Sequence, residues 1–458
     1  DDSLRESFLE LREIFPSIPG ATLDIWQTAP NGLYSSQDPD QDTYSFHGIQ
    51  TVGEDGRYRF TSVRPVEYTV PSDGPVGDIL RACGRHPWRP SHLHFIVEAE
   101  GFKPDGTVRA IFYDALTWQG KPTRVFAWIG LPAKREGKIP GIVLVHGGGG
   151  TAYKEWVQKW NAQGFAAISI AVEGQTDVNE NKVKGRPSWA RHAFSGPARD
   201  GTFADTKLPL KEQWMYHALA DTMLANSLLR SLPEVDATKI GVMGVSWGGV
   251  ITSTVIGLDT RFAFGIPTYG CGHLFDAENH WGRALHDNEG YKGVWDGMNY
   301  ADRVKMPVLW LSWPQDAHFP LGCQAEHYRQ ITGPRMVSLV TKMGHSHPAG
   351  WNPPDSYAFA KSVVETGKPW GSSPSAKTES GTGIAVFHST KPITRAVLVS
   401  TTDKGFTGTR KWVETPAAAA SGGGGTTASA PLPSGTTAWY INAYADKLTL
   451  TSDYQEIR

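Results

Sequence analysis

The sequence is poor in cysteine, in long apolar runs and in net charge. Its 458 residues include three cysteines, none of them in a C-x-x-C pair, which excludes a disulfide framework. No run of about 18 apolar residues occurs, so we expect no transmembrane helix. The net charge of −2 gives no reason to expect nucleic acid or a membrane as a partner. The first residues do not have the pattern of a signal peptide, and export would require a leader removed before Asp1.

Strand and helix patterns alternate over the middle of the chain. Apolar runs typical of buried strands lie at 141–145, 166–170 and 306–311, and a helical pattern covers 211–232. Alternating strands and helices predict a parallel sheet covered on both faces, so the fold class is α/β with a doubly wound sheet. A chain of 458 residues is also too long for one ordinary core, and we expect two or three domains.

One glycine-flanked serine carries the strongest chemical signal. Gly244-Val-Ser246-Trp-Gly248 follows the strand-like run 239–243 and precedes a small apolar segment that can begin a helix. A G-x-S-x-G in this context is the nucleophile elbow of an α/β-hydrolase, in which a tight turn lifts the serine hydroxyl above the end of the sheet. The pattern alone is weak because glycine is common here, with 50 residues. The strand before it and the partner residues after it strengthen it.

The partners of a nucleophilic serine follow in the order that this fold uses. Asp316 comes after the strand 306–311, where the fold places its acid, and His345 follows a later strand at 337–341. His347 is the alternative base. The loop His146–Gly150 ends an earlier strand and resembles the glycine loop that faces an oxyanion, so we assign those donors to the amides of Gly148 and Trp247. A metal cluster of His318, His345 and His347 competes with this interpretation, but no acidic ligand shares the spacing of these histidines.

Residues 104–366 resemble the dienelactone hydrolase and acetyl xylan esterase-like branch of the α/β-hydrolases. The matching segments are 120–128, 146–150, 244–249 and 269–272. Dienelactone hydrolases use a cysteine nucleophile, so Ser246 argues for an esterase acting on ordinary oxygen esters without a cofactor. The resemblance implies a small-molecule ester substrate, either an acetylated carbohydrate or a lactone derived from an aromatic compound. The inserts 175–207 and 272–300 are expected at the mouth of the pocket.

The last quarter of the chain is predicted to form a separate small β domain. Residues 367–383 are rich in Gly, Ser, Pro and Lys, which is typical of a linker, and strand candidates follow over 384–458. Within this domain the low-complexity segment 417–430 is predicted to be a loop. The resemblance to esterases with an accessory domain supports a small all-β domain here.

Residues 20–102 resemble a second family, the intradiol ring-cleavage (catechol and hydroxyquinol 1,2-) dioxygenases. The matching segments are 20–27, 31–34, 55–58, 63–68, 71–78 and 84–94. The family binds non-haem Fe(III) through two tyrosinates and two histidines, which implies Tyr34, Tyr68, His92 and His94 as ligands, with Arg89 beside the substrate. The pair His92/His94 suits a strand, because residues i and i+2 point to one face.

The second resemblance covers only part of that family's β-sandwich. After about Phe102 the later strands of the family are replaced by hydrolase sequence, so residues 1–103 are expected to form a partial, β-sandwich-like dioxygenase segment.

Three functions therefore compete. The first is a serine esterase. The second is an iron dioxygenase, bifunctional or ancestral, in aromatic catabolism. The third is a non-catalytic glycan-binding protein that uses the C-terminal β domain and some of the 17 tryptophans.

Overall fold

A computed structural model describes residues 20–35, 38–42, 45–54, 60, 62–63, 66–69, 88–89, 94–98, 108–134, 136–180, 182 and 187–457. The chain divides into two compact units, residues 1–106 and 107–458. In the part that is described, no helix has the length and apolar character needed to cross a membrane.

The first unit is rich in strands. The central strand β1 (Thr22–Trp26) pairs antiparallel with β2 (His47–Thr51) on one edge and with β5 (His94–Glu98) on the other. A short pair joins β3 (Tyr68–Thr69) to β4 (Trp88–Arg89). Leu23 and Ile25 alternate inward along β1 and form a small apolar cluster with Ala21 and Val52. These strands agree with the predicted β character of residues 20–102.

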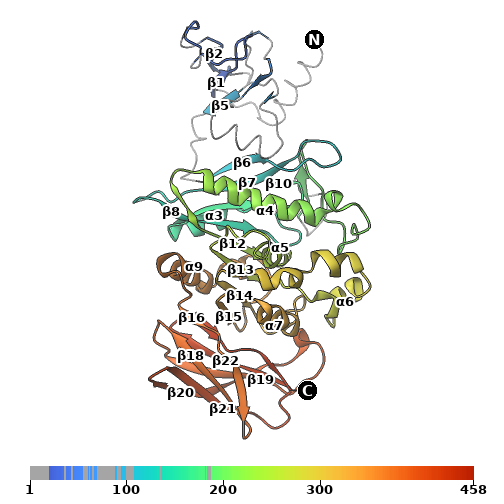
Figure 1. Ribbon diagram of the computed structural model, residues 1–458, viewed down its shortest axis with the longest axis vertical. Helices are drawn as coiled ribbons and strands as arrows, with labels where there is room; N and C mark the ends of the chain where they lie inside the picture. The colour runs from blue at the N-terminus through green and yellow to red at the C-terminus, as the bar shows by residue number, and fades with distance from the viewer. Residues whose placement is uncertain are drawn as a thin grey trace. The chain divides into compact units, whose positions relative to one another are not determined.

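The second unit is built on an eight-stranded sheet in the order β15-β14-β13-β12-β8-β9-β7-β6 (Figure 1). The strands β7 to β9 and β6 to β7 pair antiparallel, and the other neighbours pair parallel. The strands are β6 (Val108–Asp114), β7 (Arg124–Gly130), β8 (Ile139–Val145), β9 (Ala166–Ile170), β12 (Val235–Val245), β13 (Phe264–Thr268), β14 (Val308–Ser312) and β15 (Arg335–Leu339). The predicted α/β sheet is confirmed.

Helices cover both faces of this sheet, as neighbouring residues of β13 demonstrate. The ring of Phe264 lies 6.1 Å from that of Phe359 in α9 (Pro354–Thr366), whereas a side chain on Gly265 would meet Ile256, directly after α5 (Trp247–Val255). Successive strand residues point to opposite faces, so α9 and α5 lie on opposite sides of the sheet. The remaining helices are α3 (Lys154–Ala162), α4 (Trp214–Ser231), α6 (His280–Leu285), α7 (Leu321–Gln330) and α8 (His347–Trp351).

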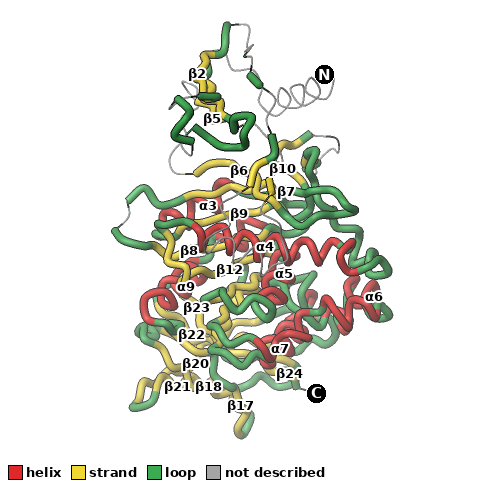
Figure 2. The backbone as a smooth tube through the Cα atoms, turned by 45° about the horizontal axis from the view of Figure 1, so that its top comes forward, coloured by secondary structure: helices red, strands yellow, loops and turns green. Residues whose placement is uncertain are grey.

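The C-terminal strands form an antiparallel sheet within the same unit. Their order is β16-β18-β21-β20-β19-β22-β23, with β17 added on β18 and β24 on β22. The strands are β16 (Gly371–Ser372), β17 (Ala376–Glu379), β18 (Thr382–Ser389), β19 (Arg395–Thr401), β20 (Val413–Gly422), β21 (Gly425–Pro431), β22 (Ala438–Ala445), β23 (Leu448–Thr451) and β24 (Gln455–Glu456). Figure 2 shows these strands as yellow segments beside α7.

Two predictions in this region differ from the structure. The expected linker 367–383 contains β16 and β17, both paired with β18, because short strands at a sheet edge tolerate Gly, Ser and Pro. The expected loop 417–430 is instead the hairpin β20–β21, which turns at Gly423 and Gly424. Ala428 on β21 is fully buried, whereas the side chains of β20 are half-buried or exposed. Composition gave the wrong structure because backbone pairing does not depend on large side chains.

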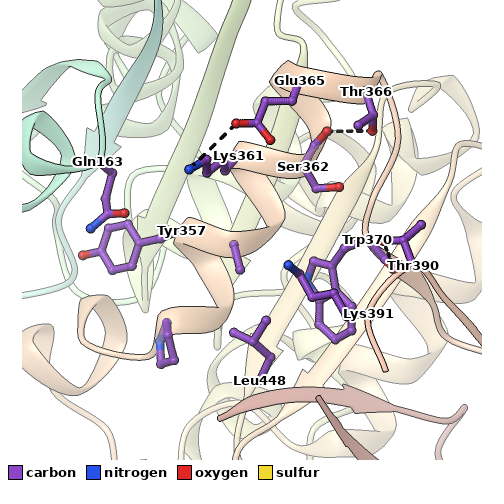
Figure 3. A pocket seen from close by; sticks show the side chains of 12 residues that line it. Gln163, Tyr357, Lys361, Ser362, Glu365, Thr366, Trp370, Thr390, Lys391 and Leu448 are labelled. Carbon is purple, nitrogen blue, oxygen red and sulfur yellow. Dashed lines mark hydrogen bonds and ion pairs between the residues drawn. The ribbon is translucent and has the colours of Figure 1, made fainter. Parts of the chain in front are cut away.

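A pocket lies where α9 meets the C-terminal strands (Figure 3). Trp370 is buried in its lining, and Lys361 and Glu365 of α9 form an ion pair with 3.9 Å between nitrogen and oxygen. That pair lies within the helix, whereas the contact between α9 and β23 is made by Thr449, which donates its backbone N–H to the carboxylate of Asp355 at 2.7 Å. This pocket lies at the boundary between the two sheets. None of the residues predicted for catalysis lines it.

The buried Asp355 predicts an unusual pH dependence of stability. Burial raises the pKa of Asp355 to about 6, from an ordinary value near 4. Between these two pKa values the folded protein keeps a proton on Asp355 that the unfolded chain has released. The free energy of unfolding therefore falls as the pH rises through this range, by up to about 3 kcal/mol from this residue. The variant Asp355→Asn should lose that dependence. Urea unfolding at pH 4.5 and 7.5 checks it: the stability of the variant relative to the natural protein should increase with pH, and a constant difference would contradict the account.

Candidate active site

Ser246 lies at a strained turn between β12 and α5. Its backbone has φ 59° and ψ −116°, a conformation that a residue with a side chain rarely adopts. The turn closes because its neighbours have no side chains: a Cβ on Gly244 would lie 2.0 Å from the oxygen of Gly248, and one on Gly248 would lie 2.1 Å from the oxygen of Val145. The strand–serine–helix geometry expected of a nucleophile elbow is therefore present.

A hydrogen-bonded chain runs from Ser246 through His345 to Asp316. His345 Nε2 lies 3.0 Å from Ser246 Oγ, and His345 Nδ1 lies 2.8 Å from Asp316 Oδ2. The other carboxylate oxygen of Asp316 accepts the backbone N–H groups of His318 and Phe319, both at 2.8 Å. The structure thus brings together the three residues predicted for catalysis, at the carboxyl ends of β12, β14 and β15.

The ring of His345 is held between two aromatic side chains. Tyr269 stacks on it with centroids 4.5 Å apart, and Phe319 lies nearly parallel to it at 6.0 Å. Asp316 is 2% exposed, so its hydrogen bond to His345 is shielded from water. These contacts fix the orientation of the imidazole, which is what a base needs if it is to act on a neighbouring hydroxyl.

His347 occupies a different place from His345. It begins α8 and its Nε2 accepts the backbone N–H of Gly147 at 2.9 Å. Burial lowers the pKa of His347 to about 4, so this ring is neutral near pH 7. His345, not His347, contacts Ser246. The competing metal cluster of His318, His345 and His347 also finds no support, because the described residues contain no group of three His, Cys, Asp or Glu side chains able to hold a metal.

His146 fixes the glycine loop, a role that the sequence analysis missed. It is 1% exposed, and its Nε2 lies within hydrogen-bonding distance of Val172 N (3.1 Å) and Gln175 Nε2 (3.0 Å). Its Nδ1 lies 2.7 Å from the oxygen of Gly147. Burial lowers the pKa of His146 to about 4, which keeps the ring neutral. The position of His146 directly before four glycines was the sequence signal that could have indicated this role.

The loop lies against Trp247, the residue after the serine. A Cβ on Gly148 would be 2.7 Å from Trp247 Cδ1, so only glycine fits there. The guanidinium of Arg199 lies over the indole of Trp247, with 4.8 Å from its carbon to the ring centroid, and Arg199 Nε donates to Glu173 at 3.2 Å. Gly148 and Trp247, the predicted oxyanion donors, are therefore neighbours.

The two inserts contribute aromatic walls around Trp247. Phe203 packs at 5.4 Å and Trp281 at 5.0 Å between ring centroids, and Trp247 is 5% exposed. Trp189 donates its indole N–H to the oxygen of Gly149 at 2.9 Å. These contacts bring parts of the inserts 175–207 and 272–300 beside Trp247 and the glycine loop.

In the first unit the two candidate tyrosine ligands lie side by side. The rings of Tyr34 and Tyr68 pack edge to face, with 5.5 Å between centroids. Burial and a hydrogen bond that the Tyr34 hydroxyl donates to Tyr68 raise the pKa of Tyr34 above its usual value. The backbone of His94 lies on β5 opposite Trp26, and Arg89 lies opposite Tyr68. His92 lies outside the described residues, as do the side chains of His94 and Arg89. Two phenol groups in contact suit a shared hard cation such as Fe(III).

The tryptophans of the C-terminal strands are not a surface for glycan stacking. Trp370 and Trp439 are buried, and Trp412 packs against Tyr440 at 5.8 Å. Over the described residues 384–457, no aromatic side chain is among the exposed large apolar ones. The glycan-binding alternative relied on the C-terminal β domain and on exposed tryptophans, and the described part of that domain contributes no strongly exposed tryptophan.

Two family models match different parts of the chain. Residues 103–281 match the model described as acetyl xylan esterase (AXE1), and residues 16–115 match a model described as dioxygenase. These two matches confirm both family resemblances that were drawn from the sequence. Over residues 103–281 the match supports an esterase-type hydrolase.

Several curated relatives match the N-terminal part of the chain. Hydroxyquinol 1,2-dioxygenase of Rhizobium sp. (strain MTP-10005) is 50% identical over 86 residues, which are 19% of this chain and 29% of that protein. The 6-chlorohydroxyquinol 1,2-dioxygenase of Cupriavidus pinatubonensis is 43% identical over 86 residues, 19% of this chain and 31% of that protein. The chain thus spans about three-tenths of the length of these relatives.

Two of the solved structures that this chain resembles correspond to the two parts. An acetyl xylan esterase from Paenibacillus sp. R4 is 25% identical with a TM-score of 0.42, covering 54% of this chain and 81% of that one. A hydroxyquinol 1,2-dioxygenase from Pseudomonas putida DLL-E4 is 49% identical with a TM-score of 0.18, covering 19% of this chain and 30% of that one.

The tight turn at Ser246 predicts that a side chain at position 248 destabilises the protein. The variant Gly248→Ala should unfold at a lower temperature than the natural protein, because its Cβ must displace the backbone oxygen of Val145; the expected loss of stability is roughly 1–3 kcal/mol or more. Gly322→Ala, in α7 with open space around its Cβ, is the matched control and should not lower the unfolding temperature. Thermal unfolding followed by circular dichroism measures both, and equal unfolding temperatures would contradict the account.

Proposed function

We propose that this protein is a serine carboxylic-ester hydrolase with Ser246 as nucleophile, His345 as base and Asp316 as the orienting acid. The single observation that carries the proposal is the hydrogen-bonded chain from Ser246 Oγ through His345 to Asp316. In the first step Ser246 Oγ attacks the ester carbonyl carbon while its proton passes to His345 Nε2. The negative charge that develops on the carbonyl oxygen is held by the backbone N–H groups of Gly148 and Trp247.

The intermediate then collapses and the alcohol leaves. His345 returns the proton to the departing oxygen as the bond between the carbonyl carbon and that oxygen breaks, which leaves the acyl group on Ser246. Water attacks this acyl group with His345 again taking a proton, and the carboxylic acid is released with Ser246 regenerated. Asp316 accepts the Nδ1–H of His345 throughout and stabilises the imidazolium. The neutral His347 and His146 hold the glycine loop and take no part in proton transfer.

The substrate we propose is an ester with a short acyl group. The close packing of Phe203, Trp281 and Arg199 around Trp247 favours a small group beside the elbow. Acetylated carbohydrate is the first candidate, since residues 103–281 match the acetyl xylan esterase family model. A lactone derived from an aromatic compound is the second, because it is chemically close to the products expected of a ring-cleavage segment.

Removal of the nucleophile tests the proposal. Ser246→Ala should lower the rate of p-nitrophenyl acetate hydrolysis by roughly 10³-fold or more, because the attacking hydroxyl is lost. Ser231→Ala, an exposed serine at the end of α4, is the control and should keep the natural rate. Two further assays with the same proteins distinguish the substrate classes. One measures acetate released from acetylated xylan, and the other measures the opening of a dienelactone. Hydrolysis at the natural rate by Ser246→Ala would overturn the proposal.

A second candidate function rests on the contact between Tyr34 and Tyr68. We infer that these two residues, with His92 and His94, hold Fe(III) in the first unit, and that Arg89 lies beside a bound aromatic diol. When bound, ferric iron would supply the redox chemistry of intradiol ring cleavage. The two phenols bring oxygen donors to one place, since the rings of Tyr34 and Tyr68 pack with 5.5 Å between centroids. Since the chain covers less than a third of its dioxygenase relatives, cleavage itself is part of the proposal.

The iron site is tested by colour and metal content. Protein loaded with Fe(III) should show a visible tyrosinate-to-iron absorption band with stoichiometric iron, and Tyr34→Phe and Tyr68→Phe should each weaken both. Tyr216→Phe, an exposed tyrosine in α4, is the matched control. A protein that stays colourless after loading, or a band that survives both substitutions, would exclude Tyr34 and Tyr68 as ligands.

A further inference from the structure

The outer edge of β15 is bonded to side chains of the C-terminal strands. Val337 N donates to Ser373 Oγ at 2.6 Å, and Leu339 N donates to Thr451 Oγ1 at 2.8 Å. The oxygen of Leu339 accepts Asn442 Nδ2 at 3.0 Å. An edge strand normally leaves such groups to water or to another chain. Here they are satisfied inside the molecule, and this fixes the strand that leads to His345.

The loop that carries Asp316 is held from the same side. The helix α7 begins at Leu321 without a side-chain cap of its own, and Leu321 N instead donates to Thr407 Oγ1 at 3.2 Å. Thr407 belongs to the turn Thr407–Thr409 between β19 and β20, and it is buried. A hydroxyl from a distant part of the chain therefore serves as the cap that follows the acid loop.

The next residue in this turn touches the peptide of Asp316 itself. A Cβ on Gly408 would lie 2.6 Å from the backbone oxygen of Asp316, closer than real Cβ contacts come. The turn cannot move away easily, because Arg410 donates from Nε to the oxygen of Gly405 at 2.8 Å and from Nη2 to Glu456 at 2.6 Å. Arg410 is 5% exposed, so these bonds are shielded from water.

A further ion pair joins the other end of α7 to the C-terminal strands. Arg329 Nε lies 3.1 Å from Asp453 Oδ1, and Tyr454 N donates to the hydroxyl of Tyr328 at 2.9 Å. The helix after the acid loop is thus fixed at both ends by residues that lie more than 80 positions later in the sequence. The loop that carries Asp316 and the helix α7 therefore both pack against the C-terminal strands.

We propose that Thr407 and Gly408 are positioning residues for ester hydrolysis, acting on Asp316 through its loop. This inference rests on the proposed function of Ser246, His345 and Asp316. The turn Thr407–Thr409 determines where the backbone of Asp316 lies, and the carboxylate must remain 2.8 Å from His345 Nδ1 for the imidazole to keep its orientation. Shifts of about 1 Å at such a group lower catalytic rates by up to about 10²-fold. The C-terminal strands are then part of the catalytic apparatus and not a separate binding module.

Two pairs of variants test this inference in the full chain. Gly408→Ala should lower kcat for p-nitrophenyl acetate by roughly tenfold, with KM within about twofold, because the substrate still binds while Asp316 is displaced. Gly422→Ala, in the same sheet with open space around its Cβ, is the control and should keep the natural kcat. Thr407→Val removes the acceptor for Leu321 N at nearly unchanged volume and should lower kcat, whereas Thr407→Ser restores the hydroxyl and should recover it.

Each rate is expressed per reactive serine, titrated with a fluorophosphonate, so that a smaller folded fraction does not count as slower catalysis. If Gly408→Ala does not fold, the Thr407→Val and Thr407→Ser pair decides alone. Natural kcat per titrated serine in Thr407→Val and in any folded Gly408→Ala would overturn the inference, as would equal losses in Thr407→Val and Thr407→Ser. Failure of the proposed function has a different signature: hydrolysis by the natural protein would then not depend on Ser246.

Discussion

The oxygen of Val145 lies where a side chain on residue 248 would be, and this close approach of β8 to the start of α5 shapes the whole site. Because the two backbones touch, Ser246 must take its positive φ, and the loop after β8 begins within reach of the serine. The sheet brings the ends of β14 and β15 to the same edge, where Asp316 and His345 follow. The geometry of the proposed triad is thus a consequence of glycines as much as of the side chains of Ser246, His345 and Asp316.

Three histidines near this edge have different environments. His146 is buried and His347 is half-buried. Both are neutral near pH 7 and use a ring nitrogen to accept a backbone or amide N–H of the glycine loop and its neighbours. His345 instead lies between a carboxylate and a hydroxyl. One residue type therefore has two uses here, rigid support for the loop and proposed proton transfer, and the neighbouring groups decide which.

Much of this could be predicted from the sequence, and the remainder has a common physical cause. Ser246, Asp316 and His345 were predictable because each follows an apolar strand, and the order of strands fixes where the loops meet. His345 was favoured over His347 from its place directly after Gly344, but the sequence left both open; the contacts of His345 with Ser246 and Asp316, and of His347 with Gly147, distinguish them. The linker and loop predicted within 367–430 were wrong because composition does not report strand pairing. The contacts of Thr407 and Gly408 with the acid loop join residues about 90 positions apart, which no local pattern encodes.

The bonds along β15 also bear on how this chain can vary during evolution. A module joined by a flexible linker can be lost or exchanged by recombination, since its neighbour folds without it. Here Ser373, Thr451 and Asn442 complete the hydrogen bonding of the hydrolase sheet itself. A gene truncated near residue 370 would encode a sheet with an open edge that is prone to pair with other chains. The α/β part and its C-terminal strands are therefore expected to be inherited as one unit.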